Sequence, residues 1–492
     1  MAQVVTRRQV LLGLAGIGAV AGLSACGRGG GSPPGPAVVA PAESAGPSSG
    51  RVRDLTLRAR PVQVDLGGTV VNTWGYGDTL PGAVLRATAG DRVRIAFTND
   101  LPTETSVHWH GLAIRNDMDG VPAVTTTPTP AGGSTSFDFT IPHAGTHWFH
   151  PHHGMQMDRG LYAPFIVDDP NESGVHDHEW VVVLDDWTDG VGKSPDQIYA
   201  DLVAAGGDSS SGTTGMGGHM RGPGMGGMDG GDVAYPLYLI NGRVPTDPDV
   251  LTAKPGQKVR IRIINAAADT IFTVALGGHD LSVTHTDGYA VTPVTTSSLR
   301  LGMGERYDVI ATLGDGIFPF VAAPYGKAGI ARALVRTGAG AAPAESFRPT
   351  EVSAFPLTAD ALTAAPGTAL AQRDPDTVQD VALSGSMRPY VWTINGRTYD
   401  QTVPLTINPG QAGRLRITNM SMMSHPVHLH GHTFQLGPAG GSGARKDTVL
   451  VPPMGAVNVD LVADNPGQWM VHCHNAYHAE AGMMTRLEYV SA

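Results

Sequence analysis

One segment occurs three times along this chain of 492 residues, and that repetition limits the possible folds more than any other property of the sequence. The copies span residues 89–99, 255–265 and 409–419; each is a turn followed by alternating apolar and polar positions, and each ends in asparagine. Alternation with a period of two predicts a β-strand with one buried face. The residues expected to face inward are Val93, Ile95, Phe97, Val259, Ile261, Ile263, Gly413, Leu415 and Ile417.

The spacing of the copies predicts the domain organisation. The three asparagines lie 166 and then 154 residues apart, and the tetrapeptide Ile-Asn-Gly-Arg at 240–243 recurs at 394–397. Abundant glycine (65) and proline (37) suit a turn-rich β protein. We therefore predict an all-β chain of three consecutive Greek-key β-sandwich domains, at residues 51–170, 171–345 and 346–492.

The N-terminal segment is typical of an exported protein. Arg7 and Arg8 precede an apolar stretch from Val10 to Leu23, which is too short to span a bilayer but fits the core of a signal peptide. The arginine pair resembles a twin-arginine signal, and residues 23–26 resemble a lipoprotein cleavage box. We predict a signal peptide over residues 1–26, lipidation of Cys26, and a flexible tether over 27–50. We therefore expect the protein in the cell envelope or periplasm, or outside the cell, attached to the membrane only through the lipid. The alternative is a soluble secreted protein.

Charge and cysteine content argue against two other classes of protein. The formal net charge is −11 and no basic run is present, so we do not expect a nucleic-acid partner. Cys26 and Cys473 are the only cysteines, which rules out a disulfide scaffold.

Histidines recur at fixed positions relative to the repeat. His108 and His110 lie 9 and 11 residues after the first repeat asparagine, and His428 and His430 lie 9 and 11 after the third. A second pair follows a later glycine by 5 and 7 residues in the same two domains: His150 and His152 after Gly145, His472 and His474 after Gly467. The middle domain has Val274, Leu276, Val321 and Ala323 at the matching positions.

The geometry of a strand explains why these pairs indicate a metal site. Residues i and i+2 of a strand point to the same face, so each pair presents two imidazoles side by side. Eight imidazoles suit copper, zinc, iron or nickel. The simplest assembly packs domains 1 and 3 together with the metal enclosed between them.

A second site is predicted from residues that are out of phase with these pairs. Cys473 lies between His472 and His474 and therefore points to the opposite face of the strand. His425, Cys473, His478 and Met483 supply two imidazoles, a thiolate and a thioether, which is the ligand set of a blue-copper electron-transfer site. Domain 1 has Pro151 at the position of Cys473, so we expect one such site, connected to the histidine cluster through Cys473.

The four motifs, at 108–111, 145–153, 425–431 and 472–483, together resemble those of the three-domain multicopper oxidases, and the resemblance covers residues 51–492. It implies three cupredoxin-like domains, four copper ions and reduction of O₂ to water. By position, it implies that type 1 copper is held by His425, Cys473, His478 and Met483, and type 2 copper by His108 and His428. The type 3 pair would be held by His110, His150, His152, His430, His472 and His474. It further implies that Asp119 supplies protons to O₂; Glu480 lies one residue beyond a second family acid, whose position is Ala479 here.

Several other residues near these motifs have open roles. His147, His153 and His432 lie near the expected ligands, and we expect them to hydrogen bond or pack rather than bind metal. Met420 and Met422 precede His425; they either form a thioether route for copper to the type 1 site or serve in packing. Met423 matches a substrate-copper methionine of copper-efflux oxidases.

The electron donor is predicted from a methionine-rich segment at 208–232. It holds Met216, Met220, Met225 and Met228 among glycines, and thioethers select Cu(I). We predict an oxidase of Cu(I), and of Fe(II), that serves copper detoxification. A laccase acting on phenols is the alternative, and a non-catalytic copper-binding protein is a third hypothesis that the complete ligand set disfavours. A copper nitrite reductase is disfavoured by the third domain.

Overall fold

The computed structural model describes residues 48–172, 174, 176–207, 230–371, 373–437 and 442–491. The predicted signal peptide, Cys26, most of the tether and the four methionines of the 208–232 segment lie outside these residues. Among the described residues, none of the helices has the length and apolarity needed to cross a membrane.

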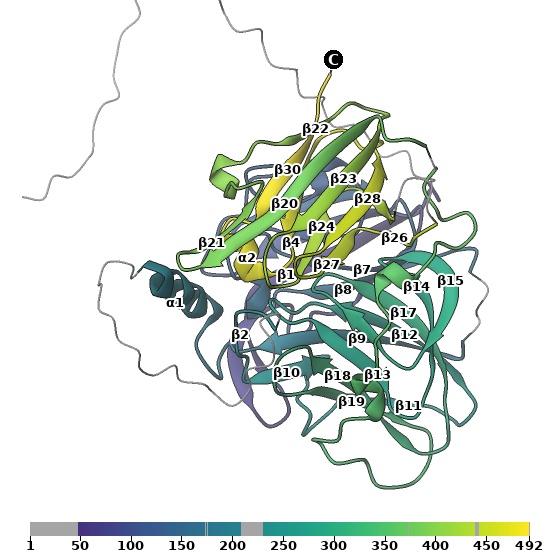
Figure 1. The fold of residues 1–492 in the computed structure, drawn as a ribbon. Helices are drawn as coiled ribbons and strands as arrows, with labels where there is room; N and C mark the ends of the chain where they lie inside the picture. The colour runs from purple at the N-terminus through teal and green to yellow at the C-terminus, as the bar shows by residue number, and fades with distance from the viewer. Residues whose placement is uncertain are drawn as a thin grey trace, which may run out of the picture. The chain divides into compact units, whose positions relative to one another are not determined.

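The described chain is built mainly of β-strands that form six sheets, two for each unit of the repeat (Figure 1). This confirms the prediction of an all-β chain of β-sandwich domains. We refer to strands β1–β8 as domain 1, β9–β19 as domain 2 and β20–β30 as domain 3.

In domain 1 the sheet orders are β2-β1-β4-β6 and β3-β8-β7-β5. Its strands are β1 (Val52–Asp65), β2 (Val70–Tyr76), β3 (Leu85–Thr88), β4 (Arg92–Asn99), β5 (His108–His110), β6 (Ser134–Thr140), β7 (Gly145–His150) and β8 (Ala163–Asp168). Short 3₁₀ turns lie at Asn116–Met118 and Met157–Arg159.

In domain 2 the orders are β10-β9-β12-β17-β14-β15 and β11-β19-β18-β13-β16. Its elements are β9 (His178–Trp187), α1 (Pro195–Gly207), β10 (Leu237–Ile240), β11 (Val250–Thr252), β12 (Lys258–Asn265), β13 (Phe272–Leu276), β14 (Leu281–Thr286), β15 (Tyr289–Thr296), β16 (Leu299–Leu301), β17 (Arg306–Thr312), β18 (Ile317–Pro324) and β19 (Ala331–Arg336).

In domain 3 the orders are β21-β20-β23-β28-β25-β26 and β22-β30-β29-β24-β27. Its elements are β20 (Thr377–Met387), β21 (Tyr390–Ile394), β22 (Leu405–Ile407), β23 (Ala412–Asn419), β24 (His425–Leu429), β25 (Phe434–Leu436), β26 (Arg445–Lys446), β27 (Thr448–Val451), β28 (Ala456–Val462), β29 (Gln468–Cys473), α2 (Ala476–Glu480) and β30 (Met484–Tyr489). Turns of 3₁₀ helix occur at Thr350–Ser353, Ala359–Ala361 and Tyr399–Gln401.

The three repeat segments form equivalent strands. β4, β12 and β23 each pair in parallel with the first strand of their domain, namely β1, β9 and β20. All nine residues expected to face inward are buried. Because the alternation places every second side chain in the core, the sandwich buries the apolar face of each repeat strand as the sequence predicts.

Each repeat strand ends in a buried asparagine that holds the loop after it. The side-chain amides of Asn99, Asn265 and Asn419 donate hydrogen bonds to backbone carbonyls of the following loop and of a second segment, at 2.7 to 3.1 Å. Their side-chain carbonyls accept from the backbone N–H two residues later. This local bonding fixes the path from the repeat strand to the next strand, which carries histidine pairs in domains 1 and 3.

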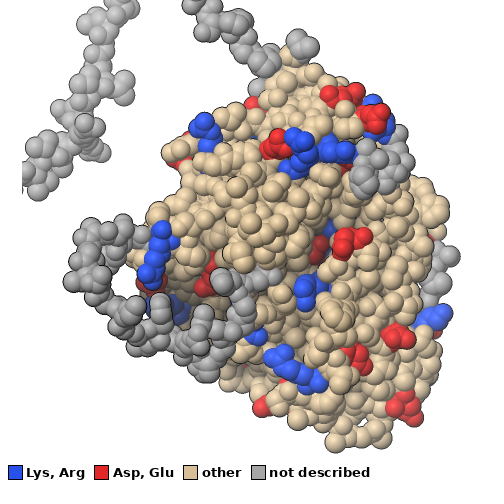
Figure 2. Space-filling view, viewed as in Figure 1, with Lys and Arg blue, Asp and Glu red and all other residues tan. Residues whose placement is uncertain are grey.

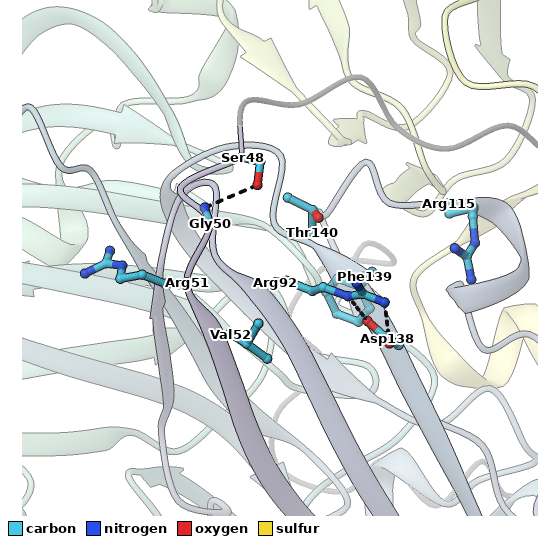
Figure 3. Close-up of a pocket in the computed structure, with 9 residues that line it drawn as sticks. All are labelled: Ser48, Gly50, Arg51, Val52, Arg92, Arg115, Asp138, Phe139 and Thr140. Atoms are coloured by element: carbon cyan, nitrogen blue, oxygen red, sulfur yellow. Dashed lines mark hydrogen bonds and ion pairs between the residues drawn. The ribbon is translucent and has the colours of Figure 1, made fainter.

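The visible surface carries charges of both signs in small separate groups (Figure 2), a pattern that suits a solvated exterior. A pocket of about 320 Å³ lies where β1, β4 and β6 begin or end, away from the histidine motifs (Figure 3). Arg92 on its wall pairs with Asp138 through two bonds of 2.6 and 2.8 Å. Arg51 and Arg115, which also line the pocket, pair with Asp91 and Asp117, so each of its three arginines has a carboxylate partner.

Candidate metal centres

Two short strand pairings bring the histidine motifs together. In domain 1, β5 pairs with β7 so that His108 lies opposite His150. In domain 3, β24 pairs with β29 so that His428 lies opposite His472. The two arrangements are equivalent because the same repeat positions each strand.

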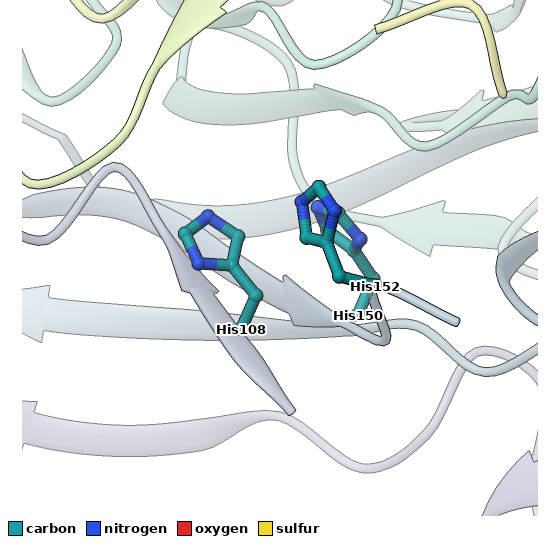
Figure 4. A group of neighbouring side chains, drawn as sticks. All are labelled: His108, His150 and His152. Carbon is teal, nitrogen blue, oxygen red and sulfur yellow. The ribbon is translucent and has the colours of Figure 1, made fainter. Parts of the chain in front are cut away.

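The histidines of domains 1 and 3 meet face to face. The rings of His108 and His430 stack with centroids 3.7 Å apart, and those of His110 and His428 stack at 3.8 Å. Figure 4 shows the rings of His108 on β5, His150 at the end of β7 and His152 just beyond that strand. All eight paired histidines lie in triplets whose ring nitrogens are within 4.8 Å of one another: His108, His110, His150, His152, His428, His430, His472 and His474.

Seven ring nitrogens of this cluster lack hydrogen-bond partners, whereas Nε2 of His430 and Nε2 of His472 lie 3.1 Å from each other. The seven atoms without partners are His108 Nε2, His110 Nδ1, His150 Nε2, His152 Nε2, His428 Nε2 and both nitrogens of His474. A buried polar atom without a partner is costly, so their convergence calls for an ion that accepts several imidazole ligands. Burial first, and the neighbouring imidazoles second, lower the pKa of His150 and His430 well below the usual value. A lowered pKa favours the neutral form of these two rings, which is the form that binds metal.

The other ring nitrogens are held by fixed acceptors, which orient the rings. The Nδ1 atom of His150 lies 3.1 Å from the carbonyl of Pro151, and that of His472 lies 2.8 Å from the carbonyl of Cys473. Asp119 is 1% exposed, and its carboxylate lies 3.0 Å from His430 Nδ1 and 3.2 Å from His108 Nδ1. Asp119, the acid expected from the sequence, thus lies at the cluster and contacts one histidine of domain 1 and one of domain 3.

The second predicted site is also assembled. The Sγ atom of Cys473 lies 3.6 Å from His425 Nδ1 and 3.8 Å from His478 Nδ1, and these two nitrogens are 3.1 Å apart. Met483 is buried, and its backbone pairs with Cys473 and His478. Two nitrogens and a sulfur that converge in this way fit one small ion with mixed ligands.

The outer nitrogens of this second site have polar partners that the sequence analysis did not identify. Ser421 Oγ lies 2.7 Å from His425 Nε2, and Asp232 Oδ2 lies 3.1 Å from His478 Nε2. Burial opposes protonation of His478, but the charge and hydrogen bond of Asp232 outweigh it and raise the pKa of His478 to about 10. Asp232 belongs to domain 2 and is 246 residues from His478, so no local pattern could have revealed it.

The two sites are joined by one strand. Cys473 ends β29 with its thiol in the second site, while His472 and His474 on either side of it belong to the eight-histidine cluster. An electron can pass from the thiolate to the cluster through the peptide and side-chain bonds of adjacent residues. The alternation of β-strand side chains produces this connection.

A small cavity leads to the cluster beside this strand. It has a volume of about 160 Å³, and His150, His152, His472, His474, Ala479 and Glu480 contribute to its wall. Burial raises the pKa of Glu480, and nearby His153 opposes that shift. Glu480 therefore lies on a path to the histidines even though Ala479 occupies the position of the family acid.

The remaining sequence-predicted residues divide into buried and exposed groups. His432 bonds to Tyr489 at 2.6 Å and to the carbonyl of His430, as expected for a packing residue. Met423 is buried two residues before His425, whereas Met420 and Met422 are 62% and 54% exposed. His147 is buried and neither of its ring nitrogens has a hydrogen-bond partner.

The flanks of the methionine-rich segment lie at the second site. On one side, Tyr199 of α1 donates to the carbonyl of Glu480 in α2, at 3.1 Å. On the other, Asp232 contacts His478, which also belongs to α2. The described residues on both sides of this segment, although they belong to domain 2, therefore contact the helix that carries His478.

Known proteins share the whole organisation. Family models described as multicopper oxidase match residues 59–172, 178–341 and 372–491. The chain is 51% identical over 459 residues to Multicopper oxidase MmcO of Mycobacterium tuberculosis, across 92% of this chain and 90% of that protein. It is 26% identical to a Copper resistance protein A homolog of Pseudomonas syringae pv. tomato, across 88% of this chain and 92% of that protein.

The fold is also that of a solved structure. The crystal structure of Fet3p, described as a multicopper oxidase that functions in iron import, superposes with a TM-score of 0.76 at 20% identity, across 89% of this chain and 90% of that one. Together with the matches over all three domains and the paired histidine clusters, these similarities show that the chain belongs to the multicopper oxidase family.

Proposed function

We propose that this oxidase takes single electrons from Cu(I), and from Fe(II), at a type 1 copper and delivers them to O₂ at three further coppers. The observation that carries the proposal is the strand β29, which places the thiol of Cys473 in one site and both neighbouring histidines in the other. Bound copper would supply the redox chemistry, namely one-electron oxidation at the first site and reduction of O₂ to water at the second.

We assign the ligands by combining the geometry with the family motifs. His425, Cys473, His478 and Met483 hold the type 1 ion, and His108 and His428 hold the type 2 ion. The type 3 pair takes His110, His150, His152, His430, His472 and His474. The unpartnered nitrogens are compatible with these assignments, because Nε2 of His108 and His428 and Nδ1 of His110 are each available to a metal ion.

The protein's own residues supply protons and direct the flow of electrons. Asp119 contacts His108 and His430 through separate carboxylate oxygens and can pass a proton into the cluster. Glu480, whose pKa is raised, lines the cavity that leads to the same histidines and would serve as the entry point for protons. Solvent is excluded from the ligands because every one of them except His152 is buried.

Three observations favour Cu(I) as the donor. Met423 is buried two residues before His425, and the exposed Met420 and Met422 flank Ser421, which bonds to His425. Tyr199 and Asp232, on either side of the methionine-rich segment, both contact α2, which carries His478. A relative named for copper resistance shares the domain organisation. Soft thioethers favour Cu(I) over harder cations, so we propose a role in copper detoxification.

O₂ uptake with different donors tests this proposal. The copper-loaded protein is offered Cu(I), Fe(II) and a bulky phenol in turn, beside a variant lacking residues 212–229, which keeps Asp232 and its bond to His478. We expect faster turnover of the metal ions and a shift towards the phenol in the deletion variant. Faster turnover of the phenol by the intact protein, unchanged by the deletion, would instead identify a laccase.

We also propose that the protein is exported by a twin-arginine route and anchored through a lipid on Cys26. The support is the sequence of residues 1–26. Metabolic labelling with a radioactive fatty acid tests the anchor: the intact protein should be labelled and Cys26→Ala should not. Release of unlabelled protein into the medium would show that the chain is secreted in soluble form.

A further inference from the structure

Domain 2 has no histidine pair of its own, yet part of it lies against the cluster. The loop between β16 and β17 brings Gly304 so close that a Cβ atom there would lie 2.8 Å from Cδ2 of His474 and 3.1 Å from Cε1 of His110. Its φ of +84° is one that glycine adopts without strain. The loop is therefore packed directly on histidines of domains 1 and 3.

Two residues after Gly304, Arg306 joins all three domains. Its side chain is fully buried, and its two terminal nitrogens bind the two carboxylate oxygens of Asp447 in domain 3 at 2.7 and 2.6 Å. Its Nε donates to the carbonyl of Thr146 in domain 1 at 3.0 Å. A bidentate pair of this kind fixes both the position and the orientation of the carboxylate.

Asp447 in turn contacts two expected copper ligands. Its Oδ1 lies 3.2 Å from His110 Nε2 and 3.4 Å from His428 Nδ1, and its backbone carbonyl lies 2.9 Å from the same His428 nitrogen. The opposite nitrogens of these rings, His110 Nδ1 and His428 Nε2, are the ones without partners. A carboxylate in this position sets which nitrogen carries the proton and which is free to bind metal.

Domain 2 also fixes the backbone of Asp447. Asp287, which follows β14, accepts hydrogen bonds from the backbone N–H groups of Asp447 and Thr448 at 3.2 and 3.1 Å, and from that of Arg306 at 2.9 Å. The carboxylate of Asp447 therefore cannot rotate or shift without breaking contacts to domain 2 at both its side chain and its main chain.

We propose that Arg306 is a positioning residue for the type 2 copper: through Asp447 it orients His428, and with it His110, so that domain 2 completes the trinuclear site without supplying a ligand. The proposal rests on the ligand assignments given above. If the protein holds no type 2 copper, the unmodified protein will lack that signal, which is a different outcome from a change confined to the Arg306 variants.

The test compares Arg306→Met with Arg260→Met as a matched control. Arg260 is also a buried domain 2 arginine, and it contacts the buried carboxylate of Asp308 at 2.6 and 3.1 Å but no predicted ligand. Both copper-free variants are titrated with copper. The readouts are copper bound per chain, the electron paramagnetic resonance signal of type 2 copper, and the blue absorption of type 1 copper.

We expect Arg306→Met to weaken binding of the type 2 ion by about 10- to 100-fold, the range typical of losing an outer hydrogen-bond partner of a metal ligand. The blue absorption should remain, and Arg260→Met should retain the type 2 ion. Arg306→Lys keeps the charge but not the planar fork, so its affinity for the type 2 ion should lie between those of Arg306→Met and the unmodified protein. It replaces Arg306→Met in the test if that variant does not fold. The proposal would be overturned if Arg306→Met kept the type 2 affinity and signal of the unmodified protein; if only Arg306→Lys folds, the same result in that variant would overturn it. An equal loss of type 2 copper in Arg260→Met would also overturn it.

Discussion

The repeat asparagines offer a perturbation with a control inside the same chain. Asn419 holds the loop before His425: its amide donates to the carbonyls of Met423 at 2.7 Å and Pro452 at 2.9 Å, and its side-chain oxygen accepts from the N–H of Ser421 at 2.9 Å. Asn265 makes the matching bonds in domain 2, at 3.0, 3.1 and 3.1 Å, but no histidine pair follows it. Both asparagines are buried.

Replacement of either asparagine by alanine removes three matching hydrogen bonds of a buried group, and in Asn419 it also removes a bond from Ser421 Oγ at 2.9 Å and a longer one to the carbonyl of Val451 at 3.3 Å. At about 1 kcal/mol net for each bond, the three matching bonds contribute about 3 kcal/mol of stability in each domain. In Asn419→Ala the released loop also lets His425, His428 and His430 move, whereas in Asn265→Ala no expected ligand follows. Both variants should therefore lose stability, Asn419→Ala by somewhat more, but only Asn419→Ala should affect copper.

The assays are denaturant unfolding of the copper-free protein and recovery of blue absorption on titration with copper. Asn419→Ala should bind type 1 copper more weakly than the unmodified protein, while Asn265→Ala should bind it normally. Equal blue recovery in both variants, with stability lost in both, would refute the idea that the asparagine positions the ligands. A selective loss of blue absorption in Asn265→Ala would refute it more strongly.

Three further predictions follow from the sites and the buried ion pairs. Cys473→Ser should lose the blue absorption and all turnover but keep the type 2 signal, as measured by absorption and paramagnetic resonance; a variant that stays blue would contradict the type 1 assignment. Asp119→Asn should slow O₂ consumption by about 10²- to 10⁴-fold, the usual contribution of a positioned proton donor, with the blue absorption unchanged; unaltered steady-state O₂ uptake would exclude Asp119 from proton delivery. Asp308 is buried, which opposes its ionisation, but Arg262 and Arg260 outweigh burial and lower its pKa well below the usual 3.8. A carboxyl group with a depressed folded-state pKa contributes stability above the unfolded pKa and loses it as pH falls. Copper-free protein should therefore lose stability below about pH 4, and Asp308→Asn, already less stable at pH 7, should lose less over the same interval; parallel pH profiles would contradict this.

The sequence predicted those parts of the site that depend on local periodicity. Two histidines at i and i+2 share one face of a strand whatever the strand packs against, and Cys473 between two of them must point the other way. The repeat asparagines add a fixed spacing, because the loop they bind has nearly the same path in each domain. The core face of each repeat strand follows from the same alternation, as the burial of Val93, Ile261 and Leu415 shows.

Other residues of the site lie too far apart in the chain for such reasoning. Asp232 and His478 are 246 residues apart, and Arg306 and Asp447 are 141 apart. Nothing in the sequence around Asp232, Asp287 or Arg306 distinguishes these residues from ordinary surface charges. Only the packing of domain 2 against domains 1 and 3 buries them, and a buried charge requires a partner of opposite charge or a hydrogen bond.

The sequence alone therefore determined the fold class, the repeat and the candidate copper ligands, because strand periodicity converts spacing directly into direction. The tertiary structure decided which nitrogens of those ligands are free, which acids contact them and what the middle domain contributes. These properties arise from contacts between domains, where burial makes each hydrogen bond and ion pair obligatory, and they have no signature in local spacing.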